Sequence, residues 1–158
     1  VGVSLNLIET LLTKYPQHIA GIKDSSGDWS NTQRMLDENW DDFSIFAGSE
    51  SFLLKTMQAG GSGCISATAN INPKNIFDVY KNWQLSDAPK MQEKINAVRS
   101  IVQNYPLIPA LKCIISHFHE DQNWNILRPP LTSLNHSDSK KLITELTSIN
   151  FTLGTKNQ

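Results

Sequence analysis

The chain has 158 residues, of which 39% are hydrophobic and 18% are charged, and this composition is typical of one globular domain of ordinary size. Its formal net charge of -1 argues against nucleic acid or an anionic membrane surface as the main partner. No apolar stretch of the sequence approaches the roughly 20 residues that a membrane-spanning helix requires.

The cysteines and the first residues predict where the protein acts. Cys64 and Cys113 are isolated thiols without the spacing of a disulfide framework or of metal ligands. The opening residues 1–4 lack the basic and apolar regions of a signal peptide, so we expect a cytoplasmic protein. Because the sequence begins with Val1 rather than Met, we also expect it to be part of a longer chain.

From the N-terminus onward, segments of helical and strand-like hydrophobic spacing alternate, separated by turn and cap residues. In chain order we expect a helix from Ser4 to about Tyr15, a strand over 19–23, and a helix over 29–38 capped by Asp28. A strand over 43–48, a helix from Ser49 to Gly60 and a strand over 64–68 follow. The next helix begins at Asn72, and its buried side is expected to carry Ile76, Phe77, Tyr80 and Trp83. Three strands about 20 to 25 residues apart, each followed by a helix, indicate a parallel sheet with right-handed crossovers.

The strand pattern ends after Ser86. Three helical segments are expected beyond it, over 88–103, 110–119 and 138–150, with an irregular stretch between the last two. A three-stranded parallel sheet would have two exposed edges, whereas a closed barrel needs eight strands and ~250 residues. We therefore predict an α/β fold in which residues 1–85 form the last three strand–helix units of a (β/α)8 TIM barrel. Residues 86–158 would form a C-terminal helical region that packs on the barrel.

Lys23 is the first candidate for a catalytic residue, because it stands where an apolar run meets a polar turn. In a β/α barrel, catalytic groups stand at the carboxyl ends of the strands. An amine held there and partly removed from water can become a nucleophile toward carbonyl groups. By periodicity alone, however, a lysine at a strand end is more often a solvated surface residue. The catalytic interpretation therefore depends on the segments around it.

Three segments that follow one another along the chain favour that interpretation. They are His18-Ile19-Ala20-Gly21-Ile22-Lys23-Asp24-Ser25-Ser26-Gly27-Asp28, Phe46-Ala47-Gly48-Ser49-Glu50, and Gly60-Gly61-Ser62-Gly63-Cys64-Ile65-Ser66-Ala67-Thr68-Ala69-Asn70. In this order they resemble the dihydrodipicolinate synthase / N-acetylneuraminate lyase family of class I aldolases. The stretch Arg128-Pro129-Pro130-Leu131 is similar to that family's arginine–proline segment, and the likeness spans essentially all of the chain.

The resemblance implies a (β/α)8 barrel that binds a 2-keto acid such as pyruvate covalently and uses an aldehyde as its second substrate. It implies that Lys23 is the Schiff-base nucleophile, that Gly48 lies in the wall of the substrate pocket, and that Ile65 offers its backbone carbonyl to the bound keto acid. It also implies a homo-oligomer, either a dimer or a tetramer. No cofactor and no metal are expected, because the protonated imine itself acts as the electron sink.

Two parts of the family pattern do not appear in this sequence: the proton-relay tyrosine at a strand end and the loop that binds the keto-acid carboxylate. Tyr15, Tyr80 and Tyr105 all fall in or beside helical segments. Because imine formation needs a positioned acid–base group, we expect this chain alone to be inactive. Asp24 stands where many members of the lysine pathway have Glu, so aldolases of 2-keto-3-deoxy sugar acids remain an alternative.

Other features have less specific interpretations. The glycines at 60, 61 and 63 precede a strand, whereas phosphate-binding loops follow one, so we expect a helix end there. His117 and His119 point to nearly opposite sides of a helix and are poorly placed to share a metal. Lys112 is expected to be a surface or interface lysine. Two functions other than catalysis remain: a non-catalytic binding protein that keeps the barrel, and a structural half-barrel that assembles with itself or with a separate half.

Overall fold

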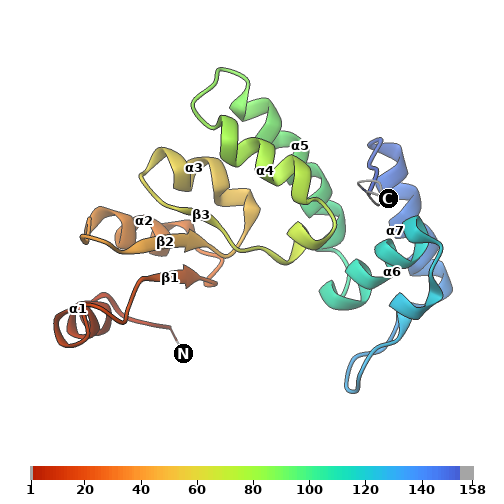
Figure 1. The fold of residues 1–158 in the computed structure, drawn as a ribbon. Helices are drawn as coiled ribbons and strands as arrows, with labels where there is room; N and C mark the ends of the chain where they lie inside the picture. Colours follow the sequence, from red (N-terminus) through yellow and green to blue (C-terminus); the bar gives the residue numbers. More distant parts are fainter. Residues whose placement is uncertain (1, 154–158) are drawn as a thin grey trace.

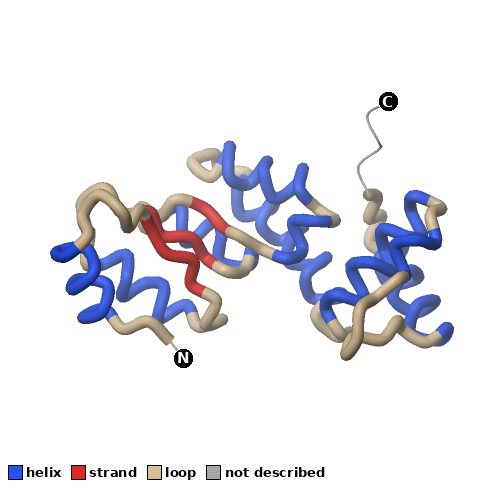
Figure 2. The backbone as a smooth tube through the Cα atoms, turned by 60° about the horizontal axis from the view of Figure 1, so that its bottom comes forward, coloured by secondary structure: helices blue, strands red, loops and turns tan. Residues whose placement is uncertain are grey.

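The computed structural model describes residues 2–153. Its elements are α1 (Leu5–Lys14), β1 (Gly21–Asp24), α2 (Trp29–Asp37), β2 (Ser44–Ala47), η1 (Glu50–Phe52), α3 (Leu53–Gln58), β3 (Gly63–Cys64), η2 (Ala67–Asn70), α4 (Pro73–Asn82), α5 (Ala88–Val102), α6 (Leu107–His119), η3 (Gln122–Asn125) and α7 (His136–Ser148), where η denotes a 3-10 helix. Figures 1 and 2 show an elongated molecule with the sheet at one end, α4 and α5 in the middle, and α6 and α7 at the other end. None of the helices within the described residues is long and apolar enough to cross a membrane.

The three strands form a parallel sheet in the order β1-β2-β3, which confirms the prediction from the strand–helix alternation. Each strand is shorter than predicted, with four residues in β1 and β2 and two in β3. In the register of the sheet, Lys23 pairs with Phe46, and Phe46 pairs with Gly63. Paired residues point to the same face of a parallel sheet, so these three positions share one face.

The other face of the sheet is covered by helices. Ile45 of β2 is buried and packs with Ile8 of α1 and Met35 of α2, and the half-buried Ile22 of β1 joins them. Side chains alternate between the faces along a strand, so Lys23 points away from this helical layer. The sequence therefore places an apolar contact on one side of β1 and an amine on the other.

Of the third predicted strand, over 64–68, only Cys64 lies in β3, and the prediction is wrong for the other four residues. Residues Ala67–Asn70 form the 3-10 helix η2 instead. The local cause is Ser66, whose side-chain oxygen accepts a hydrogen bond from the backbone N–H of Thr68 at 3.2 Å. Such a cap satisfies a backbone donor at the start of a helical turn and ends the extended conformation.

The predicted buried side of α4 is also partly wrong. Ile76 and Val79 are buried, as expected of an inward stripe, but the side chains of Phe77 and Tyr80 are 57% and 43% exposed. These two aromatic rings lie on the neighbouring stripe of the helix, with their centroids 6.1 Å apart. The apolar side of α4 is broader than its buried side, and periodicity alone does not separate the two stripes.

Two C-terminal helices begin earlier than predicted. α6 begins at Leu107 rather than at Ala110, because Pro109 falls in its first turn, where the missing N–H of proline costs no hydrogen bond. α7 begins at His136 rather than at residue 138, because Asn135 provides a side-chain cap that accepts from the N–H of Asp138 at 2.8 Å. Both differences follow from helix-terminus chemistry.

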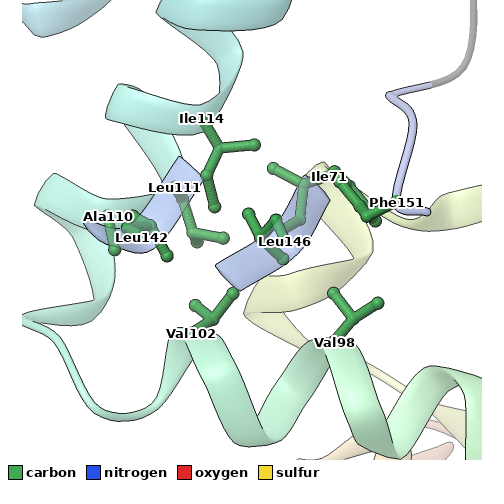
Figure 3. Close-up of a cluster of buried hydrophobic side chains, with 9 residues drawn as sticks. All are labelled: Ile71, Val98, Val102, Ala110, Leu111, Ile114, Leu142, Leu146 and Phe151. Carbon is green, nitrogen blue, oxygen red and sulfur yellow. The ribbon is translucent and has the colours of Figure 1, made fainter. Parts of the chain in front are cut away.

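The helical end of the molecule has its own buried cluster, which Figure 3 shows in close-up: Ile71, Val98, Val102, Ala110, Leu111, Ile114, Leu142, Leu146 and Phe151. A second cluster joins α3, α4 and α5. Helix α5 contributes to both, through Ala88 and Ile95 at its start and Val98 and Val102 at its end. The same helix therefore ties the sheet half to the C-terminal half, and the division into residues 1–85 and 86–158 stays a prediction.

Candidate functional site at the carboxyl ends of the strands

The carboxyl end of β1 is fixed by Asp24, which directly follows Lys23 and is 7% exposed. Its Oδ2 accepts a hydrogen bond from the Thr32 hydroxyl of α2 at 2.6 Å, and its Oδ1 accepts one from the Ser26 N–H at 2.9 Å. Burial acts to raise the pKa of Asp24, but these hydrogen bonds outweigh it and hold the pKa below its ordinary value. The ionised side chain thus anchors the turn after Lys23 to α2.

Gly48, at the carboxyl end of β2, lies directly against β1. Its N–H donates to the carbonyl oxygen of Asp24 at 2.7 Å. A Cβ atom added at Gly48 would lie 2.4 Å from that oxygen and 3.0 Å from Cα of Ser25. Only glycine allows the two strand ends to approach so closely. This contact lies one residue from Lys23, while a role of Gly48 in a pocket wall stays a prediction.

Lys23 lies near the end of its strand, as predicted, but its side chain is exposed in this chain. Lys23 lines a cleft of about 360 Å³. Gly2 and Val3 of the N-terminal segment and Asn31 and Met35 of α2 also line this cleft. Within the described residues, no hydrogen bond or ion pair holds the ammonium group of Lys23. The amine is therefore accessible, and the described part of this chain does not shield it from water.

Ile65 directly follows β3, and its side chain is 50% exposed. Its N–H donates to the carbonyl oxygen of Ala47 at 2.9 Å, so the pairing with β2 continues past the end of β3. By alternation from Gly63, its side chain falls on the same face as that of Lys23. The predicted role of its backbone carbonyl in substrate binding stays a prediction.

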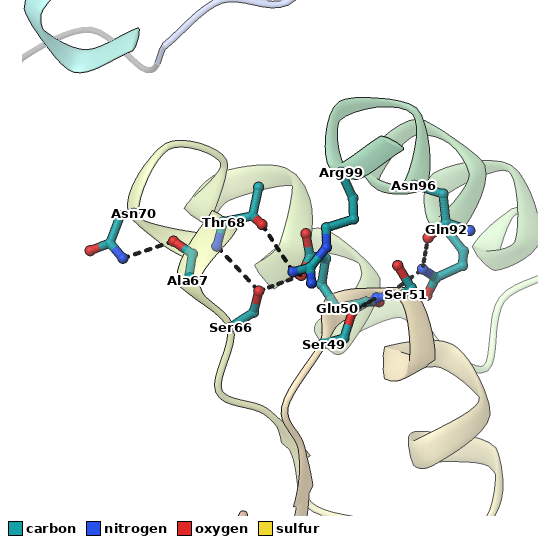
Figure 4. Close-up of polar contacts among 10 residues, drawn as sticks. All are labelled: Ser49, Glu50, Ser51, Ser66, Ala67, Thr68, Asn70, Gln92, Asn96 and Arg99. Atoms are coloured by element: carbon teal, nitrogen blue, oxygen red, sulfur yellow. Dashed lines mark hydrogen bonds and ion pairs between the residues drawn. The ribbon is translucent and has the colours of Figure 1, made fainter. Parts of the chain in front are cut away.

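A buried ion pair just beyond the strand ends was missed by the sequence analysis (Figure 4). Glu50, in η1, is 0% exposed, and its Oε2 lies 3.1 Å from Nη1 of Arg99 on α5. The same carboxylate oxygen accepts a hydrogen bond from the Ser66 hydroxyl, and Arg99 Nη1 also donates to the Thr68 hydroxyl at 3.3 Å. These contacts join the segment after β2, the segment after β3 and helix α5.

Gln92, about two helical turns before Arg99 on α5, adds two backbone contacts to this network (Figure 4). Its Nε2 donates to the carbonyl oxygen of Glu50 at 2.9 Å, and its Oε1 accepts from the N–H of Leu54 at 3.0 Å. The second carboxylate oxygen of Glu50, Oε1, is buried and has no hydrogen-bond partner within the described residues. A sequence signal did exist, because Gln92 and Arg99 are seven residues apart and so share one face of the helix.

Cys64 lies beside this network and is an unreactive thiol. Burial, and in second place the negative charge of Glu50, raises its pKa to about 11. Within residues 2–153, no group of three or more His, Cys, Asp or Glu side chains is placed to hold a metal ion.

The other candidate residues lie away from the strand ends. Lys112 is half-buried and donates a hydrogen bond to the carbonyl oxygen of Ile126, so it is a structural lysine rather than a freely solvated one. Tyr15 ends α1, Tyr80 lies on α4, and the Tyr105 hydroxyl donates to Glu145 at 2.9 Å in the C-terminal region. None of the three tyrosines lies at a strand end.

Parallel strands that alternate with helices define an α/β protein with a lysine at one strand end. The chain matches the sequence model of the dihydrodipicolinate synthetase family over residues 1–149. It is 30% identical over 141 residues to an uncharacterized DapA-like lyase from Chloroflexus aurantiacus. This match covers 87% of this chain and 46% of that protein. It is also 32% identical over 138 residues to a 4-hydroxy-tetrahydrodipicolinate synthase from Macrococcus caseolyticus. This second match covers 84% of this chain and 44% of that protein.

Solved structures agree with these similarities. Dihydrodipicolinate synthase from Agrobacterium tumefaciens superposes with a TM-score of 0.80 at 29% identity, over 94% of this chain and 50% of that one. N-acetylneuraminate lyase from Fusobacterium nucleatum superposes with a TM-score of 0.77 at 23% identity and the same coverage, which shows a shared fold. The chain belongs to the dihydrodipicolinate synthetase family, which confirms the family predicted from the sequence. It spans about half the length of the relatives it matches, and its fold corresponds to their C-terminal half.

Proposed function

We propose that the complete protein is a class I aldolase or synthase, a lyase in which Lys23 forms a Schiff base with a 2-keto acid. The observation that carries this proposal is the position of Lys23 at the carboxyl end of a parallel strand, in a chain of this family. The three strands would be the last three of a (β/α)8 barrel, with residues 86–158 as the helical region packed on it. In such a barrel the face of the sheet that carries Lys23 would be the interior.

The proposed chemistry starts with attack of the Lys23 amine on the keto carbon. The resulting carbinolamine loses water to give a protonated imine, and loss of a proton from the neighbouring carbon gives an enamine. The enamine attacks an aldehyde, and water then releases the product and the free amine; the cleavage reaction runs the same steps in reverse. Each proton transfer needs a positioned acid or base. Because the three tyrosines lie away from the strand ends, the proposal includes that this chain alone does not turn over.

The side chains around Lys23 would act by positioning rather than by chemistry. Asp24 holds the turn after it to α2, and Gly48 holds the strand end against β2. Both contacts restrict the backbone on the carboxyl side of the lysine, so the point from which its side chain reaches a bound carbonyl would be fixed. Ile65 would complete the pocket from the next strand.

Pyruvate is the proposed keto acid, and the protein is proposed to act in the cytoplasm as a dimer or tetramer. The relatives carry the names of two different enzymes, a 4-hydroxy-tetrahydrodipicolinate synthase and an N-acetylneuraminate lyase. The aldehyde of this protein is therefore left open between a lysine-pathway type and a 2-keto-3-deoxy sugar acid type.

Reductive trapping tests the proposal. The complete protein is incubated with pyruvate and borohydride, and peptide mass spectrometry then locates the adduct. We expect an adduct on the peptide that contains Lys23, its loss in Lys23→Ala, and its retention in Lys112→Ala, because Lys112 lies in α6. An adduct that persists in Lys23→Ala would overturn the assignment.

A non-catalytic binding or structural protein derived from the same barrel is the second candidate. The exposure of Lys23 and the lack of a strand-end tyrosine within the described residues favour it. The complete protein would then either bind pyruvate without forming the trapped adduct or not bind it at all. The trapping experiment, together with calorimetric titration by pyruvate, separates the two candidates.

A further inference from the structure

The C-terminal helical region contains a cavity of about 580 Å³ that none of the proposed chemistry uses. It lies between α6 and α7 and is closed at one end by η3 and the segment that leads into α7. The α7 residues that line it recur at positions 136, 139, 140, 143 and 144, which is one face of a helix. The buried core residues Leu142 and Leu146 lie on another face, and the cavity borders the core through Leu134 and Ile143, which pack against it.

Lys140 is the fully charged side chain in the lining of this cavity, and the imidazoles of His117 and His136 also border it. Among the described residues that line it there is no carboxylate. The carboxylates nearby along α7 are engaged elsewhere: Asp138 with the side chain of Asn135 at 2.8 Å, and Glu145 with the Tyr105 hydroxyl at 2.9 Å. A negatively charged ligand would therefore meet attraction from its walls and little repulsion.

The buried side chain of Ser116 presents a hydrogen-bond donor toward this cavity. Ser116 is 2% exposed, and its oxygen accepts from Nδ2 of Asn125 at 2.8 Å. The second hydrogen of that amide is directed to Oε1 of Gln122 at 2.9 Å, so Asn125 is held in place. No acceptor for the hydroxyl proton of Ser116 is found within residues 2–153. A buried donor without an acceptor is costly, and an oxyanion in the cavity would satisfy it.

Part of the lining is apolar, through Leu134 and Ile143. We propose that this cavity binds a small molecule that carries a carboxylate or phosphate group next to a short apolar group. The anionic group would be held by Lys140, His117 and the Ser116 hydroxyl. The apolar group would lie against the two aliphatic side chains. This site is separate from Lys23 and does not rest on the proposed aldolase function.

The test is a titration of the full chain with n-butyl phosphate, butyrate and neutral butanol, followed by NMR shifts of the amides of residues 136–144. We expect one or both anions to bind and butanol not to bind. Lys140→Gln should weaken binding about threefold to tenfold, and Ser116→Ala about tenfold, because each loses one contact with a charged group. Binding should be unchanged in Lys23→Ala.

Lys141→Gln is the matched control, because Lys141 is the next residue, faces Glu145 at 3.9 Å and does not line the cavity. It should change the affinity by less than about twofold. Binding of butyrate alone or of n-butyl phosphate alone would support the proposal and identify the anionic group. The proposal would be overturned if neither anion binds below about 10 mM, if butanol binds as tightly as the anions, or if both lysine variants weaken binding equally.

Discussion

The buried ion pair between Glu50 and Arg99 provides the sharpest test of how the two halves of the chain are joined. The Arg99 guanidinium reaches from α5 to a carboxylate that is 0% exposed, at 3.1 Å. Arg99→Met keeps much of the aliphatic volume of the side chain and removes only the charged donors. The carboxylate would then remain buried with the Ser66 hydroxyl as its one remaining donor within the described residues.

The expected loss of stability follows from burial. Removing one partner of a buried ion pair costs about 3 to 5 kcal/mol, because the other charge is left uncompensated. The Arg99 side chain is 23% exposed, so water already screens part of the interaction, and we expect the lower end of this range, about 3 kcal/mol. Adding Glu50→Gln removes the uncompensated charge and should recover most of the loss, leaving about 1 kcal/mol for the hydrogen bonds.

The measurement is urea unfolding of the full chain, followed by fluorescence of its four tryptophans. Arg34→Met is the control, because Arg34 is exposed on α2 and contacts only Asn31, at 3.1 Å; it should change the free energy of unfolding by less than about 0.5 kcal/mol. The reasoning fails if Arg99→Met unfolds at the wild-type midpoint, or if the double variant is less stable than Arg99→Met alone.

Three further predictions concern the strand ends. Gly48→Ala should cost about 1 to 3 kcal/mol of unfolding free energy in urea, because its Cβ would lie 2.4 Å from the Asp24 carbonyl oxygen; an unchanged midpoint would contradict this. Thr32→Val should cost about 1.5 to 3 kcal/mol at pH 7, since it removes a buried hydrogen bond to the Asp24 carboxylate. The pKa of Asp24 is lowered on folding, so its contribution is present above its unfolded pKa and is lost as the pH falls. The gap between Thr32→Val and wild type should therefore narrow toward pH 3, and a gap independent of pH would refute the assignment. Cys64 should react with iodoacetamide at pH 8 about 100-fold more slowly than a free thiol, because a pKa of about 11 leaves little thiolate; peptide mass spectrometry over time measures the rate.

The order and direction of the strands could be predicted from the sequence, because they depend on local patterns. Each apolar run is followed by a cap residue and a helical stripe, and that repetition allows few arrangements other than a parallel sheet. The lengths of the strands could not be predicted in the same way. Where Ser66 caps a helical turn, a run that looks apolar and extended stops being a strand.

The position of Lys23 was predictable, but its surroundings were only partly so. The polar turn after the strand was expected, whereas the contact of Asp24 with Thr32, eight residues on, depends on how α2 packs. The contact between Glu50 and Arg99 spans 49 residues and depends on the placement of α5 over the strand ends. Long-range polar contacts of this kind leave no periodic signal, although the helical spacing of Gln92 and Arg99 marks one polar face.

The backbone at the end of β1, next to the exposed Lys23, is held by two contacts. Asp24 ties the backbone after Lys23 to α2, and Gly48 ties it to β2, so the strand end is held from two directions. The register of the sheet places Lys23 on the same face as Phe46, which is not the face that packs on α1 and α2. Any segment that covers this face must meet the amine and remove water from it, which is the change that favours a neutral, nucleophilic lysine. The structure thus separates two requirements of the proposed chemistry: this chain fixes the backbone that carries Lys23, and the covering segment would supply the shielding of its amine.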